Sequence, residues 1–304
     1  MTPPFIPFEE GQALLDWAAL GEAFREGHKC PKAVIEDSFL YRGDDTVLSR
    51  AAWIDGMGQL VKTATIFPGN TALGLSNING AVTLFSDETG ILEAVIDFHL
   101  VTKWKTAGDS VFAAQRLARP DSRNILIIGA GTVARSLREA YGAIFPDAKF
   151  TVWNRTPAGA EALASAYPDV TLASDLETAV RSADIVTCAT MSTQPILRGD
   201  WLQPGQHIDL IGAYRPDMRE ADDACLKRAR IFVDSFDTTI AHIGELKIPI
   251  EAKTISKQDV LADFYQPDDF KRIGRDEITL FKNGGGAHLD LMTSRYILEA
   301  WRAR

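Results

Sequence analysis

The chain has 304 residues, of which 46% are hydrophobic and 24% are charged, and its formal net charge is −9 at pH 7. This composition is typical of a globular protein, and the length favours two domains over one. The acidic balance argues against a nucleic-acid partner, because binding to phosphates needs a basic face. The three cysteines, Cys30, Cys188 and Cys225, lie far apart and match neither a zinc motif nor a disulfide framework.

The N-terminal stretch "MTPPFIPFEEGQ" has neither the basic nor the apolar region of a secretion signal. No apolar run approaches the roughly 20 residues that a membrane-spanning helix needs. We therefore expect a cytoplasmic protein without a membrane partner. The five histidines are isolated and show no metal-binding spacing, so we expect no metal.

The first third of the chain predicts a helix followed by a sheet. Apolar spacing indicates a helix around residues 14–20, and residues 33–96 alternate β-rich runs with turn sequences such as "FPGN" and "SDETG". A second helix is predicted over residues 98–117, and it ends before a proline-marked break. We place a domain boundary near Pro120.

From residue 124 the pattern changes to short apolar runs, such as "NILIIG" and "ADIVTCAT", that alternate with Ala-rich helical segments. Buried strands separated by helices are typical of a parallel, doubly wound sheet. The sequence therefore predicts an α/β fold with a Rossmann domain over residues 121–286. The apolar spacing of the last residues predicts a terminal amphipathic helix.

The stretch "ILIIGAGTVARSL" carries a GxGxxA pattern directly after an apolar strand and at the start of a helix. Gly129 permits a tight turn, Gly131 lets the backbone approach a pyrophosphate, and Ala134 permits close helix packing. The pattern alone is weak, but this context favours dinucleotide binding over a purely structural turn. The predicted cofactor-binding residues of this loop are Gly129, Ala130, Gly131, Thr132 and Val133.

The stretch "FTVWNRT" ends the next predicted strand, where dinucleotide-binding proteins usually carry an acidic residue for the ribose hydroxyls. This chain has Asn154, Arg155 and Thr156 instead. A guanidinium can form two hydrogen bonds with a phosphate. We predict NADPH, bound through its 2′-phosphate; the alternative is NAD(H), with Arg155 as a solvated loop residue.

A series of ordered segments resembles the ornithine cyclodeaminase and mu-crystallin family over residues 30–300. Among them are "LVKTATIFPGN", "VTKWKTAGDSVFAAQRLAR", "TQPILRGDWLQPGQHIDLIGAYRPDMREADD" and "LFKNGGGAHLD". The third segment is closer to mu-crystallin than to the cyclodeaminases. The resemblance implies a homodimer whose discontinuous α+β substrate-binding and dimerisation domain, residues 1–120 with 287–304, flanks the Rossmann domain. It also implies a small imino-acid or amino-acid substrate.

Basic residues are the main candidates for substrate binding. Lys62 matches the family lysine that contacts the substrate carboxylate. Lys105 and Lys32 fall where relatives have arginines, and lysine lacks the two-pronged geometry of arginine. Arg50 is a candidate to replace one lost guanidinium, or is a surface arginine of a strand. Asn79 lies in a polar stretch that lines the site in relatives, although a turn role is as good an interpretation.

Tyr214 aligns with a catalytic aspartate of the cyclodeaminases, a position that is serine in mu-crystallin. Without this carboxylate, deamination loses its general base, whereas reduction of a C=N bond needs only a hydride and one proton. Tyr214 either supplies or relays that proton, or packs beside the nicotinamide. Further predicted cofactor-binding residues are Thr190, Met191, Gly212, Asn283 and Gly284; the last two also fit a simple helix-entry loop.

We therefore predict an NADPH-dependent oxidoreductase of amino-acid metabolism, a ketimine reductase. Its expected substrate is a small cyclic imino acid such as Δ1-pyrroline-2-carboxylate or Δ1-piperideine-2-carboxylate. One alternative is a cyclodeaminase-like ammonia-lyase with bound NAD, and another is an alanine or N-alkyl amino-acid dehydrogenase. A non-catalytic ligand-binding protein is the remaining alternative.

Overall fold

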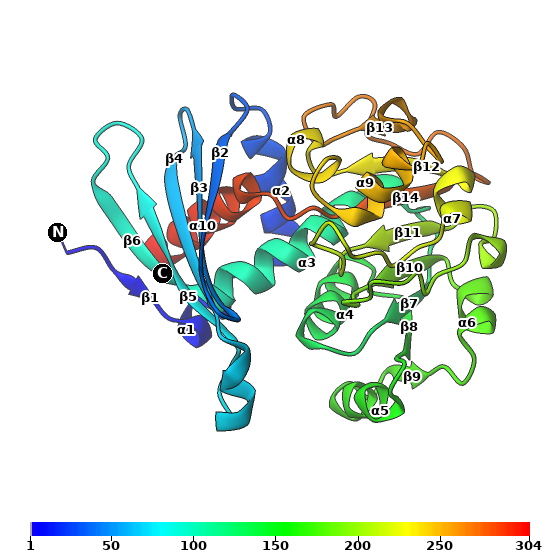
Figure 1. Cartoon of the computed structure of the whole chain (residues 1–304). Helices are drawn as coiled ribbons and strands as arrows, with labels where there is room; N and C mark the ends of the chain where they lie inside the picture. The colour runs from blue at the N-terminus through cyan, green and yellow to red at the C-terminus, as the bar shows by residue number, and fades with distance from the viewer. Residues whose placement is uncertain (1) are drawn as a thin grey trace. The chain divides into compact units, whose positions relative to one another are not determined.

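A computed structural model of the chain describes residues 2–304, which form two compact units (Figure 1). The first unit comprises the chain up to Lys105 together with Gly286–Arg304, and the second comprises Thr106–Gly285. The units divide inside helix α3 (Phe98–Leu117), whose bounds agree with the predicted helix. The predicted domain boundary lies after this helix, at residue 120. The assignment of functions to the two domains stays a prediction.

The first unit contains a six-stranded sheet in the order β1-β6-β5-β4-β3-β2. Strands β2 to β6 form an antiparallel meander, and β1 runs parallel to β6. In β4, alternate residues are buried, as expected for a strand with one face against a core. The strands are β1 (Phe5–Ile6), β2 (Val34–Arg42), β3 (Asp45–Ile54), β4 (Gly58–Ile66), β5 (Ile78–Phe85) and β6 (Leu92–Asp97).

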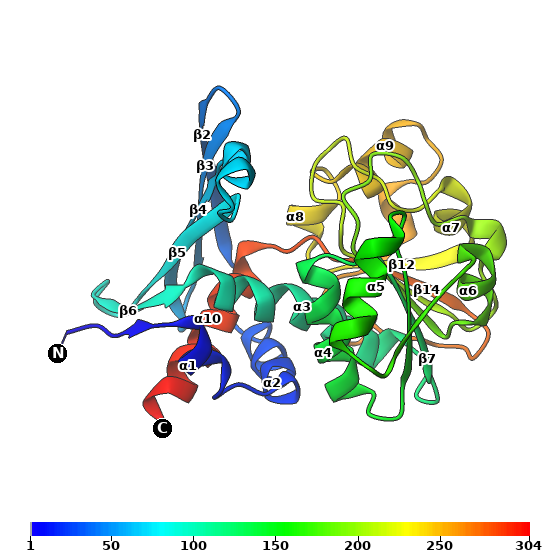
Figure 2. The same cartoon turned by 90° about the horizontal axis from the view of Figure 1, so that it is seen from below.

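Helices cover the buried face of this sheet. The C-terminal helix α10 contacts β3, β4, β5 and α2, and it lies beside the sheet in both Figure 1 and Figure 2. Helix α2 begins after Asp16, whose carboxylate accepts a hydrogen bond from the backbone N–H of Ala19 at 2.9 Å. The further helical elements of this unit are α1 (Phe8–Gln12), α2 (Trp17–Gly27), the 3₁₀ helix η1 (Pro68–Leu73) and α10 (Ala287–Arg302).

The second unit contains an eight-stranded, all-parallel sheet in the order β13-β12-β14-β11-β10-β7-β8-β9. Its central strands are buried along their whole length, because a parallel sheet is covered on both faces. The strands are β7 (Asn124–Ile128), β8 (Lys149–Trp153), β9 (Val170–Leu172), β10 (Ile185–Cys188), β11 (His207–Leu210), β12 (Ala229–Val233), β13 (Val260–Ala262) and β14 (Ile278–Lys282).

The connections between these strands are mostly helical. The helices are α4 (Thr132–Ile144), α5 (Pro157–Ala166), α6 (Leu176–Ser182), α7 (Asp223–Arg228), α8 (Phe236–Thr239) and α9 (Gly244–Glu251), with the 3₁₀ helices η2 (Gly199–Trp201) and η3 (Lys257–Asp259). The predicted α/β fold with a doubly wound parallel sheet is confirmed.

The strand order reverses direction between β7 and β10. In open parallel sheets, ligands bind at the carboxyl ends of the strands that flank such a reversal. The loops that begin at Gly129 and Ala189 therefore lie where a dinucleotide is expected to bind.

Candidate active site

The loop between β7 and α4 has the geometry of a phosphate-binding turn. Gly129 has a positive φ of 108°, and a Cβ atom at this position would lie 2.6 Å from the carbonyl oxygen of Ala189, so only glycine fits. Gly131 precedes the first turn of α4 and has open space where a Cβ would stand. Ala134 is a fully buried residue of α4. Open space at a helix N-terminus suits a pyrophosphate, so these residues fit a dinucleotide.

The residues predicted to bind the 2′-phosphate follow β8. The side-chain amide of Asn154 donates a hydrogen bond to the carbonyl oxygen of Thr156 at 2.8 Å, which fixes the turn before α5. Arg155 is exposed and, within residues 2–304, forms no ion pair. Its guanidinium is therefore available to an external anion.

The loops after β10 and β11 are joined by Glu220, which the sequence analysis missed. Its Oε1 atom accepts hydrogen bonds from the backbone N–H and hydroxyl of Thr190 at 2.7 and 2.8 Å. Its Oε2 atom accepts from the backbone N–H groups of Gly212 and Ala213 at 2.7 and 3.2 Å. Met191 is exposed in the same region. Two predicted cofactor-binding residues, Thr190 and Gly212, thus share one carboxylate.

The loop after β14 contains the remaining predicted cofactor-binding residues. The side-chain amide of Asn283 donates to the carbonyl oxygen of Thr106 and the hydroxyl of Ser110, both at 3.1 Å. The backbone N–H of Gly284 donates to the carboxylate of Asp234 at 3.1 Å. These contacts hold the loop at the carboxyl end of β14, and contact of either residue with a cofactor stays a prediction.

In the first unit, three predicted basic residues converge on Asp290, a fully buried residue of α10. The ammonium of Lys62 lies 2.8 Å from one carboxylate oxygen of Asp290. Arg50 and Lys105 lie 3.8 and 3.9 Å from the other oxygen. Arg50 is paired with Lys62 across β3 and β4, and it also forms two hydrogen bonds with Asp37. We call Arg50, Lys62, Lys105 and Asp290 the basic cluster.

The charges of the basic cluster act on one another strongly because they are buried. Burial lowers the pKa of Lys62 to about 8; Asp290 opposes this shift, and Lys105 and Arg50 add to it. Burial disfavours the ionised form of Asp290, but the surrounding cations keep its pKa below the usual value. Lys62 is therefore mostly protonated at neutral pH.

The pKa of His288 shows that a fourth predicted residue, Lys32, adds its charge to that of the basic cluster. Burial lowers the pKa of the His288 imidazole to about 3. The positive charges of Lys105 and Lys32 lower it further, and Asp290 opposes them. The structure therefore brings the charges of all four predicted basic residues into one region. Their contact with a substrate stays a prediction.

Two further predicted residues, Asn79 and Tyr214, do not belong to the basic cluster. Asn79 is paired with Thr65 of β4, so it lies on the opposite face of the sheet from Lys62. Its amide donates to the carbonyl oxygen of Ser76 at 2.9 Å, as expected for a turn residue. Tyr214 belongs to the second unit; its side chain is 59% exposed and forms no hydrogen bond with the described residues.

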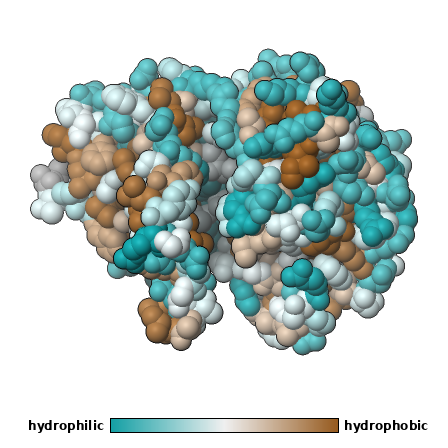
Figure 3. All heavy atoms as spheres, viewed as in Figure 1, coloured by the Kyte–Doolittle hydropathy of each residue, from teal (hydrophilic) through white to brown (hydrophobic). Residues whose placement is uncertain are grey.

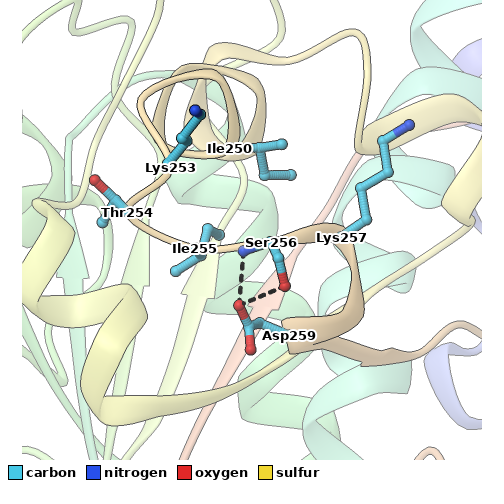
Figure 4. Close-up of a pocket in the computed structure, with 7 residues that line it drawn as sticks. All are labelled: Ile250, Lys253, Thr254, Ile255, Ser256, Lys257 and Asp259. Atoms are coloured by element: carbon cyan, nitrogen blue, oxygen red, sulfur yellow. Dashed lines mark hydrogen bonds between the residues drawn. The ribbon is translucent and has the colours of Figure 1, made fainter.

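A surface hollow of about 390 Å³ lies at the end of α9 (Figure 4). Ser256 and Asp259 bond to each other across its rim. Its lining residues are Ile250, Lys253, Thr254, Ile255, Ser256, Lys257 and Asp259. They include no predicted site residue. Across residues 2–304 we find no set of three or more metal-ligating side chains, and no helix with the length and apolarity to span a membrane.

The fold and the glycine loop define a dinucleotide-binding protein, and the basic cluster suits an anionic substrate. The family model described as the ornithine cyclodeaminase/mu-crystallin family matches residues 51–304. The chain is 50% identical to the Δ1-pyrroline-2-carboxylate reductase of Paracoccus denitrificans, covering 97% of this chain and 96% of that one. It is 33% identical to the ketimine reductase mu-crystallin of Mus musculus, covering 79% and 75%.

Among solved structures, an archaeal alanine dehydrogenase dimer with bound NAD superposes with a TM-score of 0.90 at 26% identity, covering 100% of this chain and 97% of that one. The chain belongs to the ornithine cyclodeaminase/mu-crystallin family, and the predicted family is thus confirmed.

The pKa of Lys62 can be tested through anion binding. Pyrrole-2-carboxylate, a planar analogue whose ring nitrogen does not titrate near neutral pH, should bind more weakly above pH about 8, where Lys62 loses its proton. Asp290→Asn removes the negative charge that stabilises the ammonium, so the weakening should begin at a lower pH. Isothermal titration across pH measures both midpoints.

Two variants control this experiment. Lys62→Arg keeps its charge throughout the range, so its binding should lose the alkaline weakening. Asp37→Asn removes a carboxylate that pairs with Arg50 but does not contact Lys62, so the midpoint should stay near that of the wild type. Equal midpoints for the wild type and Asp290→Asn, in protein shown to be folded by thermal unfolding, would contradict the prediction.

Proposed function

We propose that this protein is an NADPH-dependent reductase of Δ1-pyrroline-2-carboxylate or a closely similar cyclic imino acid. The observation that carries the proposal is the 50% identity, over 97% of the chain, to a Δ1-pyrroline-2-carboxylate reductase. The mu-crystallin relative is also a ketimine reductase. The enzyme is thus an oxidoreductase that acts on a C=N bond, as the sequence predicts. We place the reaction in the cytoplasm, in amino-acid metabolism.

In the proposed complex, the basic cluster binds the substrate carboxylate. Lys62, Lys105 and Arg50 carry three positive charges against the two negative charges of Asp290 and Asp37, so one further carboxylate can bind without an excess of negative charge. Asp290 orients Lys62 before the substrate arrives. Holding the carboxylate fixes the position of the neighbouring C=N carbon, and such positioning raises the rate of reaction.

The reaction adds one hydride to carbon and one proton to nitrogen, and it converts the cyclic imino acid to a cyclic amino acid. Bound NADPH supplies the hydride. Gly129 and Gly131 would receive its pyrophosphate, because the space beside Gly131 is open. Tyr214, which is 59% exposed, is the proposed carrier of the proton. Tyr214→Phe removes the hydroxyl and should lower kcat and change its pH dependence. An unchanged kcat across pH would remove Tyr214 from the mechanism.

The proposed preference for NADPH over NADH rests on Arg155. The guanidinium is exposed, has no ion-pair partner within residues 2–304, and follows β8, where the adenosine ribose binds in this fold. No acidic side chain stands at residues 154–156 to repel a 2′-phosphate. Because the related alanine dehydrogenase binds NAD, NADH is the alternative cofactor against which the preference for NADPH must be measured.

We also propose a homodimer formed through the first unit. Strand β2 is the edge of its sheet, and Val34, Leu40 and Tyr41 on this strand are 75%, 70% and 72% exposed. Figure 3 shows apolar side chains on the surface of this unit. An exposed apolar edge strand promotes association, and the related alanine dehydrogenase is a dimer. A second copy of the chain is therefore the proposed partner of β2.

The proposed reaction predicts oxidation of NADPH by Δ1-pyrroline-2-carboxylate with one proline formed for each NADPH consumed. Absorbance of NADPH and chromatography of the product measure the two quantities. Ornithine with NAD should release no ammonia, and pyruvate with ammonia or methylamine should be reduced more slowly. Ammonia release from ornithine, or no reduction of any cyclic imino acid, would overturn the proposal.

The cofactor preference predicts the effect of Arg155→Ala. Loss of a charge-assisted hydrogen bond costs about 1.5–3 kcal/mol, so kcat/KM for NADPH should fall about 10- to 100-fold while the value for NADH changes little. Arg198→Ala removes an exposed arginine of the same unit and should affect neither value. Equal losses with the two cofactors would show that Arg155 does not recognise the 2′-phosphate.

The proposed dimer predicts that Leu40→Lys yields a monomer, because a lysine charge on an edge strand opposes burial. Leu172→Lys is the matched control, since Leu172 is 51% exposed on β9, the edge strand of the other sheet. Sedimentation equilibrium should give one chain mass for the first variant and two for the control. A monomeric wild type, or a dimeric Leu40→Lys protein, would refute this interface.

A further inference from the structure

Glu220 is a buried carboxylate whose hydrogen bonds connect two loops of the second unit. It follows the β11 loop in sequence and is fully buried. Four donors reach it at 2.7–3.2 Å, two from Thr190 after β10 and two from residues 212 and 213 after β11. Both carboxylate oxygens are used, one for each loop. The distance between the two loops is therefore set by the width of a single carboxylate.

The same two loops are in direct van der Waals contact. A Cβ atom on Gly212 would collide with the backbone of Thr190 and would lie 2.5 Å from an oxygen of Glu220. Residue 212 must therefore be glycine for the loops to close around the carboxylate. Such close packing leaves little freedom for either loop to shift alone.

These loops lie on one defined side of the dinucleotide-binding edge. The predicted pyrophosphate turn follows β7, and the predicted ribose residues follow β8. Strands β10 and β11 lie on the other side of β7. A dinucleotide that crosses the reversal of strand order with its adenosine over β8 must place its nicotinamide half towards β10 and β11.

A second layer of buried charge holds Glu220 itself. The carboxylate of Glu245 accepts hydrogen bonds from the backbone N–H groups of Glu220 and Ala221 at 2.6 and 3.0 Å. Burial and the negative charge of Glu245 raise the pKa of Glu220, and Lys282 opposes the shift. The Lys282 ammonium donates to the carbonyl oxygen of Leu210 at 2.8 Å, directly before the β11 loop. Glu220 and the two loops that it joins are thus anchored in the core of the unit.

We propose that Glu220 is a positioning residue for the nicotinamide half of the cofactor. It acts through Thr190 and Gly212: by fixing the separation of the two loops, it fixes the surface against which the nicotinamide ring is oriented for hydride transfer. This inference rests on the proposed function for its catalytic consequence, and on the fold alone for its effect on cofactor binding.

Glu220→Gln tests the proposal. The amide has nearly the same size, but its NH₂ group is a donor that faces N–H donors, so one loop loses its acceptor. We expect the affinity for NADPH to fall at least tenfold and the affinity for 2′,5′-ADP, which lacks the nicotinamide half, to stay within twofold of the wild type. Fluorescence and calorimetry measure both without any substrate.

The second part of the experiment measures turnover of the imino acid with NADPH and with NADPH deuterated at C4. Misplacement of the ring should lower kcat by about 100-fold and increase the deuterium isotope effect, because hydride transfer becomes slower than the other steps. Gly212→Ala should reproduce both effects with Glu220 intact, since its methyl group separates the loops. Asp184→Asn is the matched control: it changes another carboxylate that accepts from backbone N–H groups, those of Arg123 and Asn124 at the amino end of β7, and should leave kcat within twofold.

The outcomes separate the two proposals. If Glu220→Gln changes the affinities for NADPH and 2′,5′-ADP by the same factor, whether both stay as in the wild type or both fall, the positioning role is overturned. Retained binding of 2′,5′-ADP shows that each variant is folded. A wild type that binds NADPH but reduces no cyclic imino acid overturns the proposed function and leaves the binding test of Glu220 valid.

Discussion

The ion pair between Lys62 and Asp290 joins two parts of the first unit that are 228 residues apart in sequence. Both side chains are buried, and a buried charge without a partner costs several kcal/mol. Helix α10 must therefore pack on the sheet in the register that places Asp290 beside Lys62. The chain leaves the first unit after Lys105, forms the whole second unit, and returns at Gly286. This buried pair explains why the returning helix has one defined position.

The second unit uses buried carboxylates in a different way. Asp234 and Glu220 accept hydrogen bonds from backbone N–H groups of loops at the carboxyl edge of the sheet. Loops have no strand partners of their own, so their N–H groups need other acceptors when they are buried. In the first unit, then, a buried carboxylate organises cations, to which we assign the proposed substrate. In the second, buried carboxylates organise backbone, to which we assign the proposed cofactor.

Features governed by local sequence could be predicted. The glycine loop at residues 129–131 was found because its turn and open space depend on neighbouring residues, and the helix over 98–117 was found from its apolar spacing. Lys62, Lys105 and Arg50 came from the family resemblance. Asp290 and Glu220 were missed although both lie in segments that carry the resemblance, because no local pattern states which distant donors a carboxylate will meet. Asn79 shows the same limit, since strand register decides which face it occupies.

The proposed reaction and the proposed cofactor place linked demands on this chain. A lyase regenerates its NAD within each turnover, whereas a reductase must release oxidised cofactor and bind reduced cofactor every time. A phosphate contact made by one exposed arginine stays open to water and is screened by salt, so it supports recognition of a 2′-phosphate without permanent retention of the cofactor. Arg155 has that exposure. The family resemblance implies that Tyr214 replaces the cyclodeaminase aspartate, a change that would remove the base that deamination uses. The proposed exchange of cofactor and the proposed absence of that base are both compatible with net reduction, and together they argue against a lyase, which returns the hydride to its substrate.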